Sequence, residues 1–546
     1  MTEIDAALAA EYRRRGWWSD STIAGAVAEN ARIRPEAPAW TSADTTMDWA
    51  RTDAGVDTLV GLLAGAGVVP GDRVAVCLAD GIEIHLAFLA LERLGATIVG
   101  LGAKAGVREI AHLLGQSSAT TLITFARHDG RPAEALAATL AERGVTVRHL
   151  VLGLDGFTPT LAWAGEPSGW LREIEPAPAP AVTPDPDGLY LINSTSGTTG
   201  LPKAVMHTQN RWHYFHTQAV ANGELREEEV MLSIVPAPFG FGLWTSHITP
   251  AKLGAHTVVL PKFSARAAAE AIERHRVTVL CCVSTQFIMM LADPSLDEFD
   301  LSSLRVVFTG GEAVPYAKAS EFERRTGARI LQFYGSNETG LLSGTTTTDS
   351  EERRLTTAGR IVPEMQVRLL DAGRDVTDTG RGQPACLGPA LSLGYLGDDA
   401  ANAQLFTPEG WMLMGDICEI DDEGYLSVVG RISEFVVRGG KNISLAVVEA
   451  DALTHPAVRH AAAVAMPDPV LGERVCLFVE LHADADLDLA GLTAHLTEQG
   501  ASRELFPERL EVVAELPRSS GAKVAKGELR QRIAALVEAE LAGPTP

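Results

Sequence analysis

One short segment constrains this chain more than any other: a run of hydroxyl and glycine residues that ends in Pro-Lys. Ser194–Lys203 holds five hydroxyl side chains and two glycines, and it follows the apolar run Leu189–Ile192. Glycines allow a tight turn and a close approach to a ligand. Backbone N–H groups in such a turn form a concave anion site, to which Ser and Thr add donors and Lys203 adds a positive charge. The segment therefore predicts a loop that holds a polyphosphate.

Two other interpretations of this segment are less well supported. It lacks the Gly-Lys-Ser/Thr ending of a Walker A loop. A flexible Ser/Thr/Gly linker has the same composition, but it gives no reason for the terminal Pro-Lys or for the apolar strand before it. We expect a helix to begin near Arg211, after the loop.

Length and charge narrow the class of protein. A chain of 546 residues is too long for one hydrophobic core, so we expect two or more domains. The net charge of −24 argues against binding to nucleic acid or to anionic lipid. The acidic start lacks the apolar region of a secretory signal, and no apolar run is long enough to span a bilayer. These features predict a cytoplasmic enzyme with neither nucleic acid nor membrane as a partner.

The six cysteines are scattered without CxxC spacing, so they predict buried free thiols rather than disulfides or zinc ligands. Strand-like and helical patterns alternate along much of the chain. Arg73–Leu78 and Ala96–Val99 have the composition of strands, whereas Ile82–Leu94 and Ala265–His275 show helical spacing. Alternation of this kind predicts parallel sheets with crossover helices.

Ser194–Lys203 resembles the phosphate-binding motif of the adenylate-forming superfamily, which includes acyl-CoA synthetases, aryl-acid ligases, peptide-synthetase adenylation domains and luciferases. Further motifs of that superfamily follow in family order, and the resemblance covers about residues 70–530. It implies an α/β fold with a large, multi-layer N-terminal domain of parallel-sheet subdomains at 1–431. A small, mobile α+β domain is implied at 432–546.

The resemblance implies a site for ATP and AMP. Its residues in the loop are Ser194, Thr195, Ser196, Gly197, Thr198, Thr199, Gly200 and Lys203. Its residues in later motifs are Gly310, Gly311, Glu312, Phe333, Tyr334, Gly335, Ser336, Asp416 and Arg431. Glu338 is implied to hold Mg²⁺, for which a carboxylate is a suitable hard ligand. Asn337 stands where the family has Thr, and it is predicted to be catalytic together with Glu338 and Lys523.

The segment Val235–Trp244 resembles the family's acyl-pocket segment, in which Phe239 occupies the place of an aromatic gate. The predicted pocket residues are Phe239, Phe241, Gly242, Trp244, Gly311 and Gly335. Flat aromatic walls favour a compact cyclic or aromatic acid over a long chain. An aromatic core cluster is the alternative interpretation of these residues.

The resemblance implies that the small domain carries the catalytic lysine, a loop for coenzyme A and the hinge between the domains. Arg438, Gly439, Gly440 and Lys441 resemble the glycine loop that lines the pantetheine tunnel of CoA ligases. Lys523 falls at the family's catalytic lysine, although Ala522 replaces the glycine that normally precedes it. Ser433, two places after Arg431, falls at the hinge of the family.

The implied reaction joins a small carboxylic acid to AMP, with release of pyrophosphate from ATP, and then transfers the acyl group to coenzyme A. Other acceptors stay open, namely a carrier-protein thiol, an amine, or activation of a non-carboxylate such as nitrite. A nucleotide-binding module without turnover is the alternative of another class. The expected cofactors are ATP, Mg²⁺ and coenzyme A, and the chain is expected to be a monomer or a homodimer.

Overall fold

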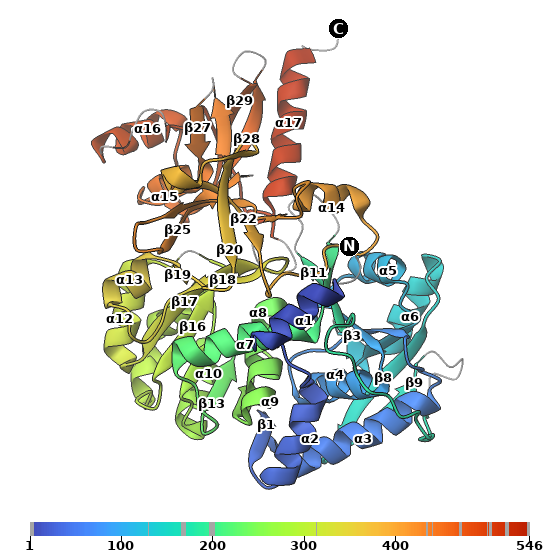
Figure 1. Cartoon of the computed structure of the whole chain (residues 1–546). Helices are drawn as coiled ribbons and strands as arrows, with labels where there is room; N and C mark the ends of the chain where they lie inside the picture. Colours follow the sequence, from blue (N-terminus) through green and yellow to red (C-terminus); the bar gives the residue numbers. More distant parts are fainter. Residues whose placement is uncertain are drawn as a thin grey trace.

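The computed structural model describes residues 5–128, 130–164, 171–195, 202–312, 314–432, 435–438, 441–468, 472–499, 501, 505–518 and 524–542. A large N-terminal part and a small C-terminal part are evident, with the small part drawn in orange and red above the large one (Figure 1). Among the described helices, none is both long and apolar enough to cross a bilayer.

One sheet of the large domain leads directly into the predicted phosphate loop. In the described residues its strands follow the order β10-β9-β8-β5-β3-β4-β11-β12, and the central strands from β8 to β11 are parallel. The strands are β3 (Arg73–Cys77), β4 (Thr97–Gly100), β5 (Thr121–Thr124), β8 (Arg148–Asp155), β9 (Thr158–Trp163), β10 (Arg172–Glu173), β11 (Leu191–Thr195) and β12 (Lys203–His207). The predicted alternation of parallel strands and crossover helices is confirmed here.

A second sheet ends at two of the predicted ATP- and AMP-binding motifs. Its order is β19-β18-β17-β16-β15-β13-β14-β1-β2, and the pairs from β1 through β14, β13, β15 and β16 to β17 are parallel. The strands are β1 (Pro38–Ser42), β2 (Thr45–Asp48), β13 (Val230–Ser233), β14 (His256–Val259), β15 (Val279–Cys281), β16 (Val306–Gly310), β17 (Arg329–Ser336), β18 (Gly340–Gly344) and β19 (Arg360–Ile361). In open parallel sheets ligands bind beyond the carboxyl ends of the strands, which here are Gly310 and Ser336.

Helices pack against these two sheets, and one hydrophobic core, which includes Trp49, Leu191 and Leu331, contains residues from both. Capping explains where several helices begin; for example, the Ser264 hydroxyl accepts the Ala267 N–H at the start of α10. The helices are α1 (Ala6–Arg14), α2 (Ile23–Ile33), α3 (Trp49–Gly65), α4 (Ile82–Leu94), α5 (Val107–Ser117), α6 (Ala133–Glu142), α7 (Gln209–Gly223), α8 (Gly240–Gly242), the π-helix η1 (Leu243–Ile248), α9 (Thr249–Leu253), α10 (Ala265–His275), α11 (Ser284–Ala292), the 3-10 helix η2 (Pro294–Glu298), α12 (Tyr316–Thr326), α13 (Glu351–Thr356) and α14 (Asp399–Leu405).

An antiparallel sheet lies between the two parts of the chain in Figure 1. It contains β20 (Gln366–Asp371), β21 (Arg374–Asp375), β22 (Arg381–Leu387), β23 (Met412–Leu413), β24 (Asp416–Ile420) and β25 (Leu426–Arg431), with the 3-10 helix η3 (Thr377–Thr379). Asp416 and Arg431 are direct cross-strand neighbours on β24 and β25.

The small domain has its own sheet and its own apolar clusters. Its elements are β26 (Phe435–Arg438), β27 (Lys441–Ser444), α15 (Leu445–Ala452), β28 (Val458–Asp468), β29 (Gly472–Leu481), α16 (Leu489–Glu498), β30 (Arg509–Val512) and α17 (Lys526–Ala542). The predicted fold class, a large domain of parallel sheets with a small second domain, is confirmed. The boundary at 431/432 and the mobility of the small domain stay predictions. All six cysteines are free and buried, as expected.

Candidate active site

The two strands that flank the predicted phosphate loop form a hairpin whose ends lie side by side. β11 and β12 pair antiparallel, and Thr195 lies opposite Lys203. Ser194 is buried in β11. The ammonium of Lys203 lies 4.7 Å from the centre of the Tyr395 ring. The hairpin therefore brings one predicted phosphate-binding cation to the edge of the sheet, beside Tyr395.

Several predicted residues lie outside the described part of the chain. They are Ser196, Gly197, Thr198, Thr199, Gly200, Ser433, Gly439, Gly440 and Lys523. For Thr195, Arg438 and Lys441 only the backbone is described, and Arg438 and Lys441 lie opposite each other at the end of the β26–β27 hairpin.

The predicted metal ligand lies beside the same tyrosine. The Tyr395 hydroxyl donates to the Glu338 carboxylate at 2.7 Å, and burial together with the Glu338 charge raises the pKa of Tyr395. Tyr395 thus has Glu338 on its hydroxyl and Lys203 on its ring. A carboxylate next to a predicted phosphate site suits Mg²⁺, which takes one or two carboxylates and completes its coordination with phosphate and water oxygens. The residues present therefore fit a magnesium ion carried by ATP.

A second carboxylate is held nearby by the strand that precedes Glu338. Tyr334, in β17, donates its hydroxyl to Asp416 Oδ2 at 2.7 Å, and Arg431 Nε lies 3.4 Å from Asp416 Oδ1. Burial, Cys418 and the Asp416 charge raise the pKa of the Tyr334 phenol, so it remains a donor. The arrangement brings together Tyr334, Asp416 and Arg431, which are all predicted to bind ATP or AMP.

The glycines of the predicted nucleotide-binding motifs at the ends of β16 and β17 are required by close packing. A Cβ added at Gly310 would lie 2.7 Å from the Phe333 carbonyl oxygen, and one at Gly335 would lie 1.8 Å from the Gly340 carbonyl oxygen. Gly311 has a φ of 76°, which favours glycine. These positions let β16, β17 and β18 approach closely at the site.

Two predicted nucleotide residues have side chains engaged elsewhere in the structure. The Glu312 carboxylate accepts from Ser284 Oγ at 2.9 Å and from Thr285 N at 3.2 Å, at the start of α11. Ser336 supports the turn that carries Glu338, because its hydroxyl accepts the Glu338 N–H at 3.2 Å and its own N–H donates to Thr339. Both therefore have a structural task in addition to any contact with nucleotide.

Two of the predicted pocket residues, Phe241 and Trp244, lie in an aromatic cluster that packs against the core, as in the alternative interpretation of this segment. Ring centres of Phe241 and Phe333 are 4.7 Å apart, and Trp244 lies 5.9 Å from Phe241. Sequence reasoning missed Phe215 and Phe308, which lie 4.9 Å and 5.3 Å from Trp244. Trp244 is fully buried, whereas Phe241 and Phe333 are half-buried, so the cluster extends from the core to an accessible face.

Gly242 and Phe239 belong to the same segment but have different surroundings. A Cβ at Gly242 would lie 2.0 Å from the Pro236 carbonyl oxygen, so only glycine fits where η1 begins. The Phe239 ring lies against Gly102, where an added Cβ would be 3.0 Å from Phe239 Cζ. Asp80 anchors the segment by accepting the Ala237 N–H at 2.7 Å.

A buried polar network behind the site was also missed by sequence reasoning. The Asn337 amide donates to Asn193 at 2.6 Å, and the Arg211 guanidinium donates to the carbonyl oxygen of Asn337 at 2.9 Å. Arg211 follows Thr208, whose hydroxyl caps α7, and it lies next to buried Trp212. Arg211 is a charged residue on the buried face of α7, and this is the feature of the sequence that would have indicated the network.

Comparison with known proteins shows to which family the chain is similar. The sequence model of the AMP-binding enzyme family matches residues 27–396, and that of the AMP-binding enzyme C-terminal domain matches residues 447–523.

Similar proteins act on several kinds of acid. The chain is 29% identical to a medium-chain fatty-acid–CoA ligase of Escherichia coli, over 96% of this chain and 92% of the relative. It is 30% identical to a salicyl-AMP ligase/salicyl-S-ArCP synthetase of Mycobacterium tuberculosis, over 95% of this chain and 92% of the relative. Among solved structures, the o-succinylbenzoate CoA synthetase of Bacillus subtilis in complex with its acyl-adenylate intermediate matches with a TM-score of 0.78 and 25% identity, over 92% of this chain and 97% of that one.

Proposed function

Because this chain belongs to the AMP-binding enzyme family of adenylate-forming enzymes, we propose that it activates a small aromatic or cyclic carboxylic acid with ATP and transfers the acyl group to coenzyme A. One observation carries the proposal. Tyr334, near the end of β17, donates a hydrogen bond to Asp416, and Glu338, in the turn after β17, accepts one from Tyr395, whose ring lies beside Lys203. One strand and its turn therefore connect predicted nucleotide-binding residues on both sides of the site.

In the first step a carboxylate oxygen of the acid forms a bond to the α-phosphorus of ATP, and the bond from that phosphorus to the bridging oxygen breaks. Pyrophosphate leaves with the bonding electrons. The acid is already ionised at neutral pH, so positioning and neutralisation of negative charge supply the catalysis. Lys203 and the loop before it bind the β- and γ-phosphates, Asp416 accepts from the ribose hydroxyls, and Lys523 bridges the carboxylate and the α-phosphate.

Glu338 holds the magnesium ion, which when bound neutralises phosphate charge. In the second step the thiol of coenzyme A, guided by Arg438–Lys441, attacks the acyl carbonyl carbon, and AMP leaves as the carbon–oxygen bond breaks. The small domain must present a different face for this step, and we propose that Ser433 is the hinge. The six buried free thiols suit the reducing cytoplasm, where we place the enzyme.

The aromatic cluster of Phe241, Trp244 and Phe333 favours a flat acid, because stacked and edge-to-face rings offer planar apolar walls. The chain is 30% identical to a salicyl-AMP ligase/salicyl-S-ArCP synthetase, so a carrier-protein thiol is the second candidate acceptor.

The test is pyrophosphate release from ATP and Mg²⁺ across a panel of acids, with and without coenzyme A. We expect release to depend on a benzoate-, cinnamate- or cyclohexanecarboxylate-type acid, and an acyl-CoA to form when coenzyme A is present. Release of ADP and phosphate would contradict adenylation. Faster turnover of a long-chain fatty acid than of every cyclic acid would contradict the proposed substrate class.

A further inference from the structure

Arg211, at the beginning of α7, is a buried guanidinium that binds backbone carbonyl groups at the site. Only 1% of it is exposed. Its Nε donates to the Ala390 carbonyl oxygen at 2.9 Å, and its two terminal nitrogens donate to those of Asn337 at 2.9 Å and Glu338 at 3.4 Å. A planar guanidinium offers its donors in a fixed fork, so these contacts define where the Asn337–Glu338 peptide lies.

The same guanidinium orients a buried histidine. Arg211 donates to Nδ1 of His207, the last residue of β12, so this nitrogen carries no proton. Burial and the Arg211 charge lower the pKa of His207 well below its usual value, which keeps the ring neutral. The remaining ring proton is then on Nε2, which donates to Asn193 Oδ1 at 2.6 Å.

Asn193 completes the network in β11, one residue before Ser194. Its Oδ1 also accepts from Asn337 Nδ2 at 2.6 Å, and its Nδ2 donates to the Pro238 carbonyl oxygen at 3.1 Å. Asn193 is 1% exposed. Three segments therefore meet through one amide: the strand that enters the phosphate loop, the turn that carries Glu338, and the acyl-pocket segment.

Fold stability alone does not account for this network. Burying a guanidinium among carbonyl groups carries a large desolvation cost, and apolar side chains of the same shape often stabilise a core as well or better. A fully satisfied buried network instead fixes one arrangement of the backbone. Here the backbone that it fixes carries Asn337 and Glu338.

We propose that Arg211, His207 and Asn193 are positioning residues that hold the Glu338 carboxylate in register with the phosphate-loop strand β11. The inference rests on the proposed adenylation reaction, in which Glu338 holds the magnesium of MgATP. Arg211 acts through the peptide before and after Glu338, and Asn193 acts through the side chain of Asn337. Loosening the network should therefore weaken magnesium binding in the nucleotide complex, so that ATP binding needs more magnesium, before it affects binding of the acid.

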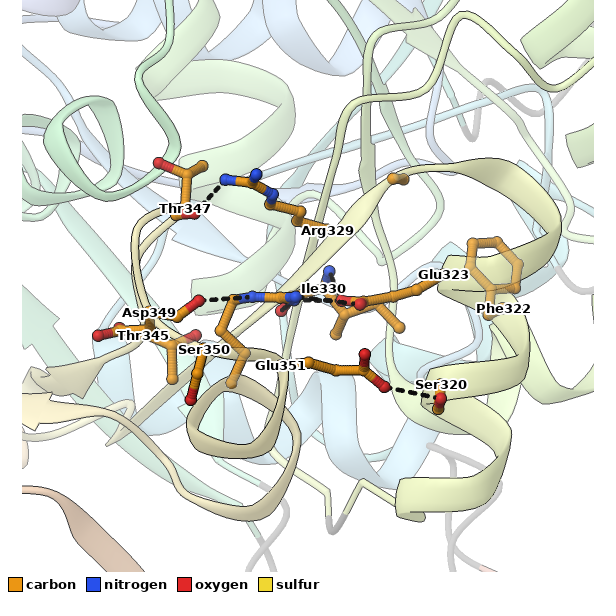
Figure 2. A network of polar contacts seen from close by, with 12 residues as sticks. Ser320, Phe322, Glu323, Arg329, Ile330, Thr345, Thr347, Asp349, Ser350 and Glu351 are labelled. Carbon is orange, nitrogen blue, oxygen red and sulfur yellow. Dashed lines mark hydrogen bonds and ion pairs between the residues drawn. The ribbon is translucent and has the colours of Figure 1, made fainter.

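The test compares Arg211→Lys with Arg354→Lys in the full chain. Arg354 is also a buried arginine of the large domain; it pairs with Glu323 and donates to the carbonyl oxygens of Ile330 at 3.4 Å and Asp349 at 3.3 Å. Figure 2 shows Glu323, Ile330 and Asp349 in that separate network. Lysine keeps the charge in both variants but cannot reproduce the fork.

The readout is the dissociation constant of ATP, measured by calorimetry across a series of MgCl₂ concentrations, with thermal melting as a check on folding. Loss of the guanidinium fork in Arg211→Lys should raise about tenfold or more the magnesium concentration at which ATP affinity reaches half of its maximum. Arg354→Lys should keep the wild-type magnesium dependence even if its melting temperature falls equally. If Arg211→Lys does not fold, Asn193→Ala, which leaves the fork intact, should give a shift of about threefold or more in the same direction.

An unchanged magnesium dependence in Arg211→Lys, or in Asn193→Ala when only that variant folds, would overturn the inference. Equal shifts in Arg211→Lys and Arg354→Lys, or ATP binding by the wild type that ignores magnesium, would also overturn it. Failure of the proposed function has a different signature, namely absence of acid-dependent pyrophosphate release from the wild-type protein.

Discussion

Replacing Asp416 with Asn tests whether the carboxylate paired with Tyr334 binds the nucleotide. The Asp416 side chain is 13% exposed, accepts from Tyr334 at 2.7 Å and lies 3.4 Å from Arg431. Asn has the same shape, but its NH₂ group places a donor where the structure has an acceptor. Loss of a hydrogen bond to a charged group costs about 1.5–3 kcal/mol. The dissociation constant of ATP should therefore rise about 10–150-fold.

Calorimetric titration of ATP measures the change in the dissociation constant directly, and steady-state rates of pyrophosphate release show how KM and kcat change. A ribose contact is made equally in the ground state and the transition state, so KM for ATP should rise while kcat stays near the wild-type value. Glu419→Gln is the matched control, because Glu419 lies in the same strand but forms an exposed pair with Arg381, and such pairs contribute little. An ATP affinity of Asp416→Asn within about twofold of the wild type would refute the reasoning.

Four further predictions concern catalysis, movement, packing and pH. Lys523→Ala should slow acid-dependent pyrophosphate release about 10²–10³-fold, because one electrostatic donor to the transition state is lost; an equal loss in thiolysis of a supplied acyl-adenylate would contradict its role. Ser433→Pro fixes φ and should abolish thioester formation while the first release of pyrophosphate survives, so a normal steady-state rate would exclude Ser433 as the hinge. Gly242→Ala places a Cβ 2.0 Å from the Pro236 carbonyl oxygen, and it should destabilise the large domain by about 1–3 kcal/mol in urea unfolding; an unchanged midpoint would contradict this. Burial raises the pKa of the Glu92 carboxyl from 4.5 to about 6 in the folded protein. The contribution of Glu92 to stability is therefore fully present below about pH 4.5 and is lost as the pH rises through about 6. Glu92→Gln should therefore melt like the wild type in acid but be more stable by up to about 2 kcal/mol above about pH 7, and a difference independent of pH would refute the assignment.

Local features of the sequence determined the elements of the fold. The apolar spacing of Ile82–Leu94 and Ala265–His275 predicted α4 and α10 with the bounds that the structure has. The apolar run before Ser194 indicated a strand, which is β11, and the helix expected near Arg211 is α7, but the strand β12 between them was not predicted. Helical periodicity, strand alternation and turn chemistry depend on residues close together in the chain, so one sequence is sufficient to detect them.

Tertiary structure decided which side chains meet. Tyr334 and Asp416 are 82 residues apart, Glu338 and Tyr395 are 57 apart, and Asn193 and Asn337 are 144 apart. Their contacts depend on the order and register of strands in different sheets, which no local pattern encodes. Arg211 shows the same limit: its sequence neighbours predicted a helix, but only the packed fold placed its guanidinium against the carbonyl groups around Glu338.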